Sequence, residues 1–291
     1  MAEQELLVER RQVELPAGLV DELRAIGFRI VEKPVLDPPH GLLDRRFALS
    51  HFASDQENIG TRMSRLYDMV TFDCYGTLID WESGIAAAFL AAAAADGKQL
   101  ERAAVLAAYA ELEPVVEAET HRSYGEVLTE TAKRVAARLD WPLPEARAPF
   151  LVASLPAWLP FHDTNPALER LATAGYRLGI LSNVDDDLLA ATRRHLRVGF
   201  DLLVTAQQVG AYKPAPNHFT VARQRIGERR WLHAAQSHFH DVVPARALGI
   251  PIAWINRKNE PRRDSARADR EFRTLTELAE WLCEPRARVS G

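Results

Sequence analysis

The stretch Met69-Val-Thr-Phe-Asp-Cys-Tyr-Gly-Thr-Leu-Ile-Asp80 decides the fold of this chain. Its apolar run stops abruptly at the carboxylate of Asp73 and is followed by a turn at Gly76 and the hydroxyl of Thr77. The pattern predicts a short buried strand that presents Asp73 at the carboxyl edge of a sheet, where open α/β sheets bind ligands. Asp73 is therefore the first candidate nucleophile, and the plainer alternative is a turn aspartate.

Four further apolar runs of strand length follow, at residues 176–182, 200–205, 231–236 and 250–256. Between Asp80 and the first of them lie four helical patterns, at residues 85–95, 100–119, 124–139 and 145–155, the second interrupted or ended near Pro114. Residues 257–270 are polar and predict a loop, and residues 272–282 predict a closing helix. The alternation indicates an α/β fold, a Rossmann-like parallel sheet flanked by helices.

The composition bounds the class of protein. The chain has 291 residues, 47% hydrophobic and 26% charged, so it can bury a sizeable core in one large domain or two modest ones. A formal net charge of −4 gives no long-range attraction to nucleic acid or an anionic membrane, so we expect a small substrate. No run of about 18 apolar residues is present and the N-terminus is acidic, so we expect no membrane span and a cytoplasmic location.

Polar residues stand at or after the ends of three of the later strands, at 176–182, 200–205 and 231–236. They are Ser182 and Asn183, Lys213 before Pro214, and Asp241 in Gln236-Ser-His-Phe-His-Asp241. In this order, together with the segment from Asp73 to Thr77, they resemble the four motifs of the haloacid dehalogenase superfamily over residues 67 to 283. The resemblance implies an α/β core at residues 65–83 and 161–285 with an inserted helical cap domain at 84–160, which would close over Asp73. Residues 1–64 are an N-terminal extension of unknown role, whose one periodic pattern is a short amphipathic segment at 19–26.

The residue two positions after the nucleophile separates the branches of this superfamily. Its phosphatases usually carry an acid there, which protonates the leaving group, and this chain has Tyr75. They also usually carry an acid four residues before the last motif aspartate, where Ser237 stands. The tyrosine resembles the 2-haloacid dehalogenase branch, whose leaving halide needs no proton. The resemblance therefore implies no metal and no cofactor, and magnesium only for a phosphatase.

Carried over by position, the resemblance assigns a role to each motif residue. Asp73 would form an aspartyl ester with the substrate carbon and Thr77 would orient it. Lys213 and Asp241 would balance charge and position water. The substrate would be held by Tyr75, Tyr109, Ser182, Asn183 and His238. The implied ligand is a small anion.

The sequence leaves three functions open, which are the dehalogenase and two rivals to it. Two positions depart from the dehalogenase pattern. The family's cap arginine, which helps to receive the halide, is absent from residues 104–113, although Arg102 and Arg122 lie nearby. A later tyrosine of the family is Phe219 in this chain. A magnesium-dependent phosphatase or phosphonate hydrolase is one rival to the dehalogenase interpretation. A non-catalytic binding protein on the same fold is another. The sequence also leaves assembly as a monomer or a homodimer open.

Overall fold

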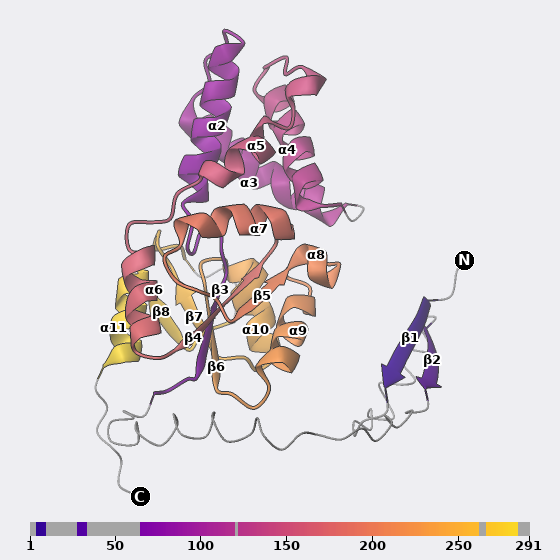
Figure 1. The fold of residues 1–291 in the computed structure, drawn as a ribbon. Coiled ribbons are helices and arrows are strands. Elements are labelled where there is room, and N and C mark those ends of the chain that lie inside the picture. Colours follow the sequence, from indigo (N-terminus) through magenta and orange to yellow (C-terminus); the bar gives the residue numbers. More distant parts are fainter. Residues whose placement is uncertain (1–3, 10–27, 34–64, 120–121, 262–265, 285–291) are drawn as a thin grey trace, which may run out of the picture. The chain divides into compact units, whose positions relative to one another are not determined.

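The structure is a computed structural model, which describes residues 4–9, 28–33, 65–119, 122–261 and 266–284. The chain divides into two compact units, residues 1–61 and residues 62–291. In the second unit, the described residues form a six-stranded sheet of order β5-β4-β3-β6-β7-β8 in which all neighbours run parallel (Figure 1). The strands are β3 (Met69–Phe72), β4 (Arg177–Ser182), β5 (Leu202–Thr205), β6 (Trp231–Ala235), β7 (Ile252–Ile255) and β8 (Arg270–Phe272). The expected parallel α/β sheet is confirmed.

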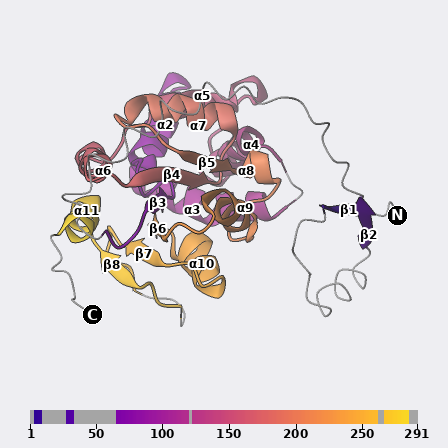
Figure 2. The ribbon, with the colours of Figure 1, turned by 60° about the horizontal axis from the view of Figure 1, so that its bottom comes forward.

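Side chains of the strands alternate between two apolar clusters, one on each face of the sheet. In β3, Val70 and Phe72 belong to one cluster and Met69 to the other. The helices are α6 (Thr164–Thr173), α7 (Asp186–Thr192), α8 (Ala206–Val209), α9 (Asn217–Ile226), α10 (Val243–Ala247) and α11 (Leu275–Cys283). Figures 1 and 2 show α6 with α11 on one side of the sheet and α9 with α10 on the other. The central strands are thereby buried on both faces.

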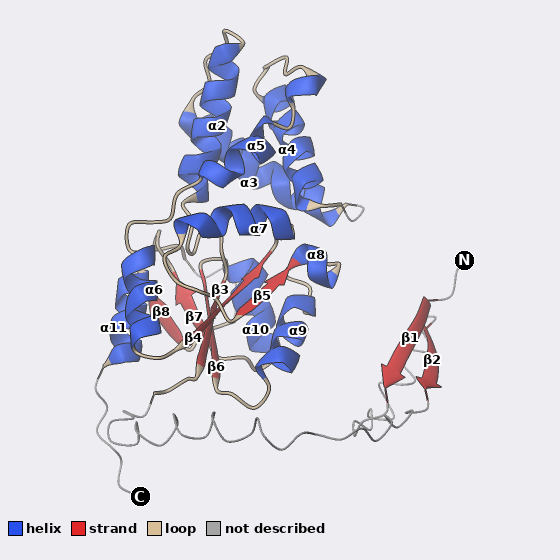
Figure 3. Ribbon diagram, in the orientation of Figure 1, coloured by secondary structure: helices blue, strands red, loops and turns tan. Residues whose placement is uncertain are grey.

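Four of the helices between β3 and β4, here called the cap helices, gather beyond the carboxyl ends of the strands (Figure 3). They are α2 (Trp81–Ala95), α3 (Arg102–Ala118), α4 (Tyr124–Arg138) and α5 (Phe150–Ser154). The side chain of Asp80 caps the N-terminus of α2, and the helix ends at Ala95, followed by Asp96 and by Gly97, whose φ is +73°. A capping box between Ser123 and Glu126 begins α4.

Two expectations for the cap helices are wrong. Helix α3 runs through Pro114 instead of ending there, because a proline removes a single donor and the flanking turns still pack. The helix expected at 145–155 is instead a 3-10 turn at Glu145–Arg147, the short α5, and a second 3-10 turn at Leu155–Ala157. Pro149 and Pro156 cannot donate the backbone bonds that a continuous helix would need.

Three strands were not expected from the sequence. Edge strand β8 begins at the last residue of the predicted loop and ends at Phe272, where the closing helix was expected to begin. Its Arg-Glu-Phe sequence carries no apolar run by which to recognise it. In the first unit, β1 (Gln4–Glu9) pairs in parallel with β2 (Phe28–Lys33). The amphipathic pattern at 19–26 lies outside the described residues. None of the helices in the described residues has the length and apolar character needed to cross a membrane.

We propose that the core does not need residues 1–62 of the N-terminal extension in order to fold. A chain that begins at Met63 should unfold within about 1 kcal/mol of the full chain, because residues 62–291 form a compact unit of their own. Urea denaturation of both chains measures the difference. A loss of several kcal/mol would show that the extension stabilises the core.

Candidate active site

The candidate site lies where the chain changes direction across the sheet. From β3 the chain builds outward through β4 and β5, then returns to place β6 on the other side of β3. The crevice outside the carboxyl ends of two such strands is the usual ligand site of an open α/β sheet. Asp73 follows β3 directly, and the segment with Asp241 follows β6. The topology therefore brings the two aspartates together.

Asp73 is held by hydrogen bonds to both carboxylate oxygens. Thr77 Oγ donates to Oδ2 at 2.8 Å, and Lys213 Nζ donates to Oδ1 at 2.9 Å. Gly76, with φ +96°, permits the turn that folds Thr77 back onto the carboxylate. The backbone N–H of Gln236 donates to Thr77 Oγ at 2.9 Å, so the hydroxyl proton of Thr77 is left to point at Asp73.

Lys213 is buried and joins both carboxylates. Its Nζ donates to Asp241 Oδ1 at 2.7 Å and to the carbonyl of Leu181 at 3.0 Å, in addition to Asp73. Burial alone would lower the pKa of Lys213, but the carboxylates of Asp241 and Asp73 outweigh it and raise that pKa well above its ordinary value. The ammonium is therefore a permanent positive charge between the aspartates.

Asn183 positions Lys213 through its backbone. Its Oδ1 accepts from the Lys213 N–H at 2.7 Å, and its Nδ2 donates to the Lys213 carbonyl at 3.0 Å. The sequence assigned Asn183 to the substrate, and this clamp is a contact that the motif comparison did not indicate. The amide nitrogen carries a second hydrogen, which can still serve a ligand.

A buried chain of hydrogen bonds supports Asp241 from behind. Trp231 Nε1 donates to Thr71 Oγ at 2.7 Å, Thr71 Oγ lies 2.8 Å from His233 Nδ1, and His233 Nε2 lies 3.0 Å from Asp241 Oδ1. Burial alone would raise the pKa of Asp241, but Lys213 and His233 hold it below its ordinary range. Sequence reasoning missed this chain, although Thr71 and His233 are both polar residues inside apolar strands.

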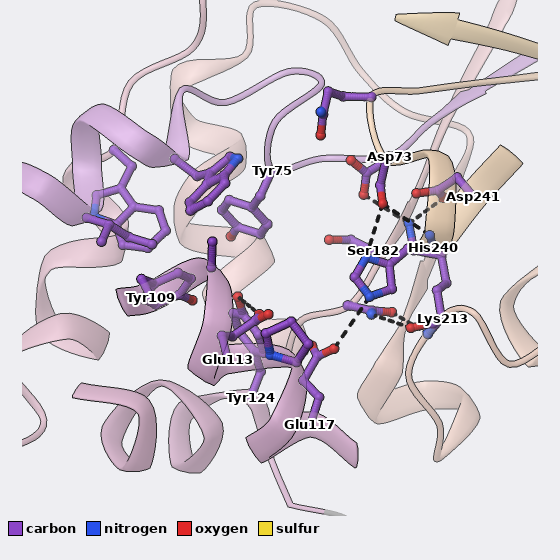
Figure 4. Close-up of a pocket in the computed structure, with 18 residues that line it drawn as sticks. Asp73, Tyr75, Tyr109, Glu113, Glu117, Tyr124, Ser182, Lys213, His240 and Asp241 are labelled. Atoms are coloured by element: carbon purple, nitrogen blue, oxygen red, sulfur yellow. Dashed lines mark hydrogen bonds and ion pairs between the residues drawn. The ribbon is translucent and has the colours of Figure 1, made fainter. Parts of the chain in front are cut away.

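A cavity of about 250 Å³ lies between these groups and helix α3 (Figure 4). Among the predicted site residues it is lined by Asp73, Tyr75, Tyr109, Ser182, Asn183, Lys213 and Asp241. Thr77 stands behind Asp73. Within the described residues, Ser182 Oγ and Asp241 Oδ2 are buried and have no hydrogen-bond partner. These two atoms are free to bind a substrate or water.

The two tyrosines form part of an aromatic wall. The hydroxyl of Tyr75 lies 2.8 Å from Thr192 Oγ, and its ring meets Trp158 edge-on with centroids 6.0 Å apart. Tyr109 packs against Trp81 at 5.6 Å. Burial raises the pKa of both Tyr75 and Tyr109 well above the ordinary value, so each remains a neutral phenol.

His238 and His240 lie on different sides of the turn Ser237–Val242. The ring of His238 meets that of Trp254 edge-on with centroids 5.1 Å apart, and its Nε2 lies 3.1 Å from the Ala266 carbonyl. His238 does not line the cavity. His240 does line it, with Nδ1 3.1 Å from Ser237 Oγ. Burial lowers the pKa of His240, which favours the neutral imidazole. The histidine that the structure places at the cavity is therefore not the one that the sequence analysis selected.

Helix α3 contributes two carboxyl groups that sequence reasoning missed. Glu113 and Glu117 are one helical turn apart on the face of Tyr109, and Figure 4 shows both directed into the cavity opposite Asp73. Tyr124 donates to Glu113 Oε1 at 3.4 Å, and Glu117 Oε2 lies 3.9 Å from His240 Nε2. Burial raises the pKa of Glu113 to about 7 and that of Glu117 to about 9. The four-residue spacing from Tyr109 was the available signal, and the expected helix break at Pro114 obscured it.

No arginine of the described residues lines this cavity. Arg102 Nη2 lies 3.4 Å from the hydroxyl of Ser83, and Arg122 pairs with Glu119 at 3.0 Å. Arg257 acts from outside the cavity, because it donates to the carbonyl of Thr77 at 2.8 Å. The basic side chains at the cavity are Lys213 and His240.

Comparison with protein families agrees with this geometry. A family model described as haloacid dehalogenase-like hydrolase matches residues 67–243. The chain belongs to the haloacid dehalogenase-like hydrolases. The matched residues begin before β3 and end beyond Asp241, so they include all four motifs, from Asp73 to Asp241.

Individual relatives cover smaller parts of the chain. An (S)-2-haloacid dehalogenase of Pseudomonas putida is 31% identical over 127 residues, 42% of this chain and 56% of that protein. Another, from Pseudomonas sp. strain YL, is 36% identical over 101 residues, 34% of this chain and 44% of that protein. The chain thus matches about half the length of these relatives.

Solved structures match more of the chain at lower identity. An L-2-haloacid dehalogenase from Xanthobacter autotrophicus with chloropropionic acid covalently bound is 18% identical, with a TM-score of 0.63 over 74% of this chain and 97% of that one. The HAD-hydrolase YfnB from Bacillus subtilis, bound to magnesium, is also 18% identical, with a TM-score of 0.65 over 74% and 98%. At this identity the likeness shows the shared fold.

The buried glutamates predict a loss of stability at alkaline pH. The pKa of each glutamate is higher in the folded protein than the ordinary 4.5. At a pH between 4.5 and the folded pKa, the native state therefore binds more protons than the unfolded state. The stabilisation is complete below about pH 4.5 and is lost as the pH rises through about 7 and about 9. In Glu117→Gln the side chain at position 117 is neutral at every pH. Between about pH 6 and pH 9, the Tm of this variant should therefore fall by several degrees less than the Tm of the wild type.

Glu111→Gln is the matched control for that comparison. Glu111 lies on the same helix but is exposed and paired with Arg138, so this variant should follow the wild-type profile. Calorimetric scans of the three proteins across this pH range make the measurement. If Glu117→Gln follows the wild-type curve as well, Glu117 is not neutral in the folded protein.

Proposed function

We propose that this chain is a hydrolase that displaces halide from a small 2-haloalkanoic acid through an ester with Asp73. The observation that carries the proposal is Asp73 itself, a carboxylate that lines the cavity, held beside an ammonium group, with a phenol where a proton-donating acid would stand two residues later. The names of the Pseudomonas relatives support the same chemistry.

The first step is a displacement at carbon. One carboxylate oxygen of Asp73 attacks C2 of the substrate, an O–C bond forms, the C–halogen bond breaks, and halide leaves with the bonding electrons. Thr77 and Lys213 hold the two oxygens of Asp73 and so fix the direction of attack. Halide needs no proton, which suits Tyr75, whose raised pKa makes it a poor acid.

The substrate carboxylate is expected at the end of β4. Ser182 Oγ is buried and unpartnered there, and the second hydrogen of Asn183 Nδ2 is available beside it. A ligand carboxylate would satisfy the Ser182 hydroxyl, whose burial without a partner otherwise costs about 1–3 kcal/mol. We propose that these two donors orient C2 toward Asp73.

The second step returns the free enzyme. Water attacks the carbonyl carbon of the ester, the bond from that carbon to the substrate oxygen breaks, and the 2-hydroxy acid leaves with the oxygen that Asp73 first supplied. Asp241 Oδ2 is unpartnered and can orient this water, and the neutral imidazole of His240 can accept one of its protons and pass it to the departing alkoxide oxygen. The other proton of the water is released to solvent when Asp73 returns to its carboxylate form. Lys213 offsets the charges of Asp73 and Asp241 before the first step, and that of Asp241 while Asp73 is a neutral ester.

The same residues fit magnesium poorly. Magnesium takes octahedral oxygen ligation, usually from one or two carboxylates together with substrate phosphate. Oδ1 of Asp73 and of Asp241 each already accept from Lys213, and positions 75 and 237 carry no acid. Among the residues that the structure describes, no group of three or more His, Cys, Asp or Glu side chains is arranged to hold a metal ion. No step of the proposal therefore passes through a metal or a cofactor.

Asp73→Asn should abolish halide release from 2-chloropropionate and leave the fold intact, because the amide is nearly isosteric but a far weaker nucleophile. Halide release and thermal unfolding measure the two effects. The exposed Asp187, which lies outside the cavity, provides the control Asp187→Asn, which should keep wild-type turnover.

Isotope labelling tests the ester directly. In a single turnover in heavy-oxygen water, the label should enter Asp73, and the product hydroxyl should carry unlabelled oxygen. Mass spectrometry of the peptide with Asp73 and of the hydroxy acid reports both. Labelled product beside unlabelled Asp73 would mean that water attacks C2 directly, and the proposal would then be wrong.

A further inference from the structure

Two carboxyl groups stand on the cap side of the cavity. Glu113 and Glu117 reach in from α3. Lys213 lies on the opposite side, where two aspartates already share it, and His240 Nε2 lies 3.9 Å from Glu117 Oε2. Pro114 also lines the cavity and has no N–H, so the carbonyl of Ala110, on the same wall, lacks its usual helical donor. This wall is suited to a group that donates hydrogen bonds.

Aromatic rings surround the same space. The cavity is lined by Tyr75, Trp81, Tyr109, Tyr124 and Trp158. The faces of such rings attract cations, most strongly when the site is shielded from water. Carboxyl groups set among aromatic rings are a chemistry that recognises a positively charged nitrogen.

The opposite end of the cavity has the reverse character. Ser182 is 1% exposed and its hydroxyl has no partner among the described residues. Beside it stands Asn183, whose amide has one hydrogen to spare. The cavity thus has a donor end at β4 and an acceptor end at α3, and a single compact ligand can satisfy both.

We infer that Glu113 and Glu117 form a subsite for an ammonium group, so that the substrate is a halogenated acid that also carries an amino group. This inference rests on the proposed function for the position of the carboxylate and of the reacting carbon. Glu113 and Glu117 would each accept hydrogen bonds from the ammonium, with the ring of Tyr109 beside it. These residues set specificity, and the chemistry stays with Asp73.

Binding of a cation at this subsite must be coupled to protons. In the ligand-free cavity, burial raises the pKa of both glutamates, and an ammonium group would favour their ionised forms. The titratable groups that face them come from four elements, and they are Tyr109, Tyr124, Tyr212, Lys213 and His240. Lys213 already favours ionisation of Glu117, whereas Glu113 opposes it. Affinity for a cation should therefore rise with pH, and binding near neutral pH should release protons.

The test compares two inert ligands of equal size, 4-aminobutyrate and pentanoate, which differ by an ammonium in place of a methyl group. Isothermal titration calorimetry of the full chain measures binding with no turnover. We expect 4-aminobutyrate to bind at least about tenfold tighter near pH 8, with heats that depend on the buffer because protons are released. The pair 5-aminopentanoate and hexanoate extends the comparison by one methylene. Equal or weaker binding of both amino ligands, or no measurable binding of any ligand, would overturn the inference.

Substitution of each glutamate tests whether Glu113 and Glu117 cause the preference for the amino ligand. Glu113→Gln and Glu117→Gln should each reduce the preference for the amino ligand, and the exposed Glu111→Gln should preserve it. A preference that survives in both cavity variants would overturn the subsite. Halide release from 2-chloropropionate is measured separately. Turnover of 2-chloropropionate without tighter binding of the amino ligands would contradict this inference alone. Absence of turnover would contradict the proposed function.

Discussion

The arrangement of the site depends on one buried ammonium group. Lys213 lies between Asp73 and Asp241, and removing it would leave two carboxylates facing each other in a space of low dielectric. A buried charge is tolerated only when it is paired and hydrogen-bonded, and Nζ has a third acceptor in the carbonyl of Leu181. The clamp from Asn183 and the support of Asp241 by His233 follow from the same requirement. Charge balance therefore determines which polar residues surround the strand ends.

The sheet and the cap helices contribute different groups to the cavity. Groups on the sheet side carry the nucleophile and its counter-charge, whereas α3 supplies the wall that a substrate's far end would meet. Asp185 joins the two parts, because its carboxylate accepts from the backbone N–H groups of Tyr124 and Gly125 at 3.0 and 2.9 Å. The orientation of α4, and of Tyr124 beside Glu113, is thus tied to the end of β4.

The sequence predicted most of what depends on short-range pattern. The apolar run before Asp73 indicated a strand, and the order of Ser182, Lys213 and Asp241 indicated one shared site. Features that depend on long-range packing were not predictable, such as edge strand β8, whose polar residues are held by backbone pairing to β7. The inward face of α3 beyond Pro114 was missed because propensity favours a break there, and tertiary packing overrides it. His238 and His240 could not be distinguished, because the turn that contains them determines which one faces the cavity.

We propose that Lys213, and not a metal ion, balances the charge around Asp73. The most direct measurement compares two reactions on one preparation, halide release from 2-chloropropionate with excess EDTA and phosphate release from p-nitrophenyl phosphate with magnesium. We expect halide release that EDTA does not change and no appreciable phosphatase activity. Strict magnesium dependence of either reaction would show that a metal ion, and not Lys213 alone, balances the charge. Loss of both activities would point to a binding protein.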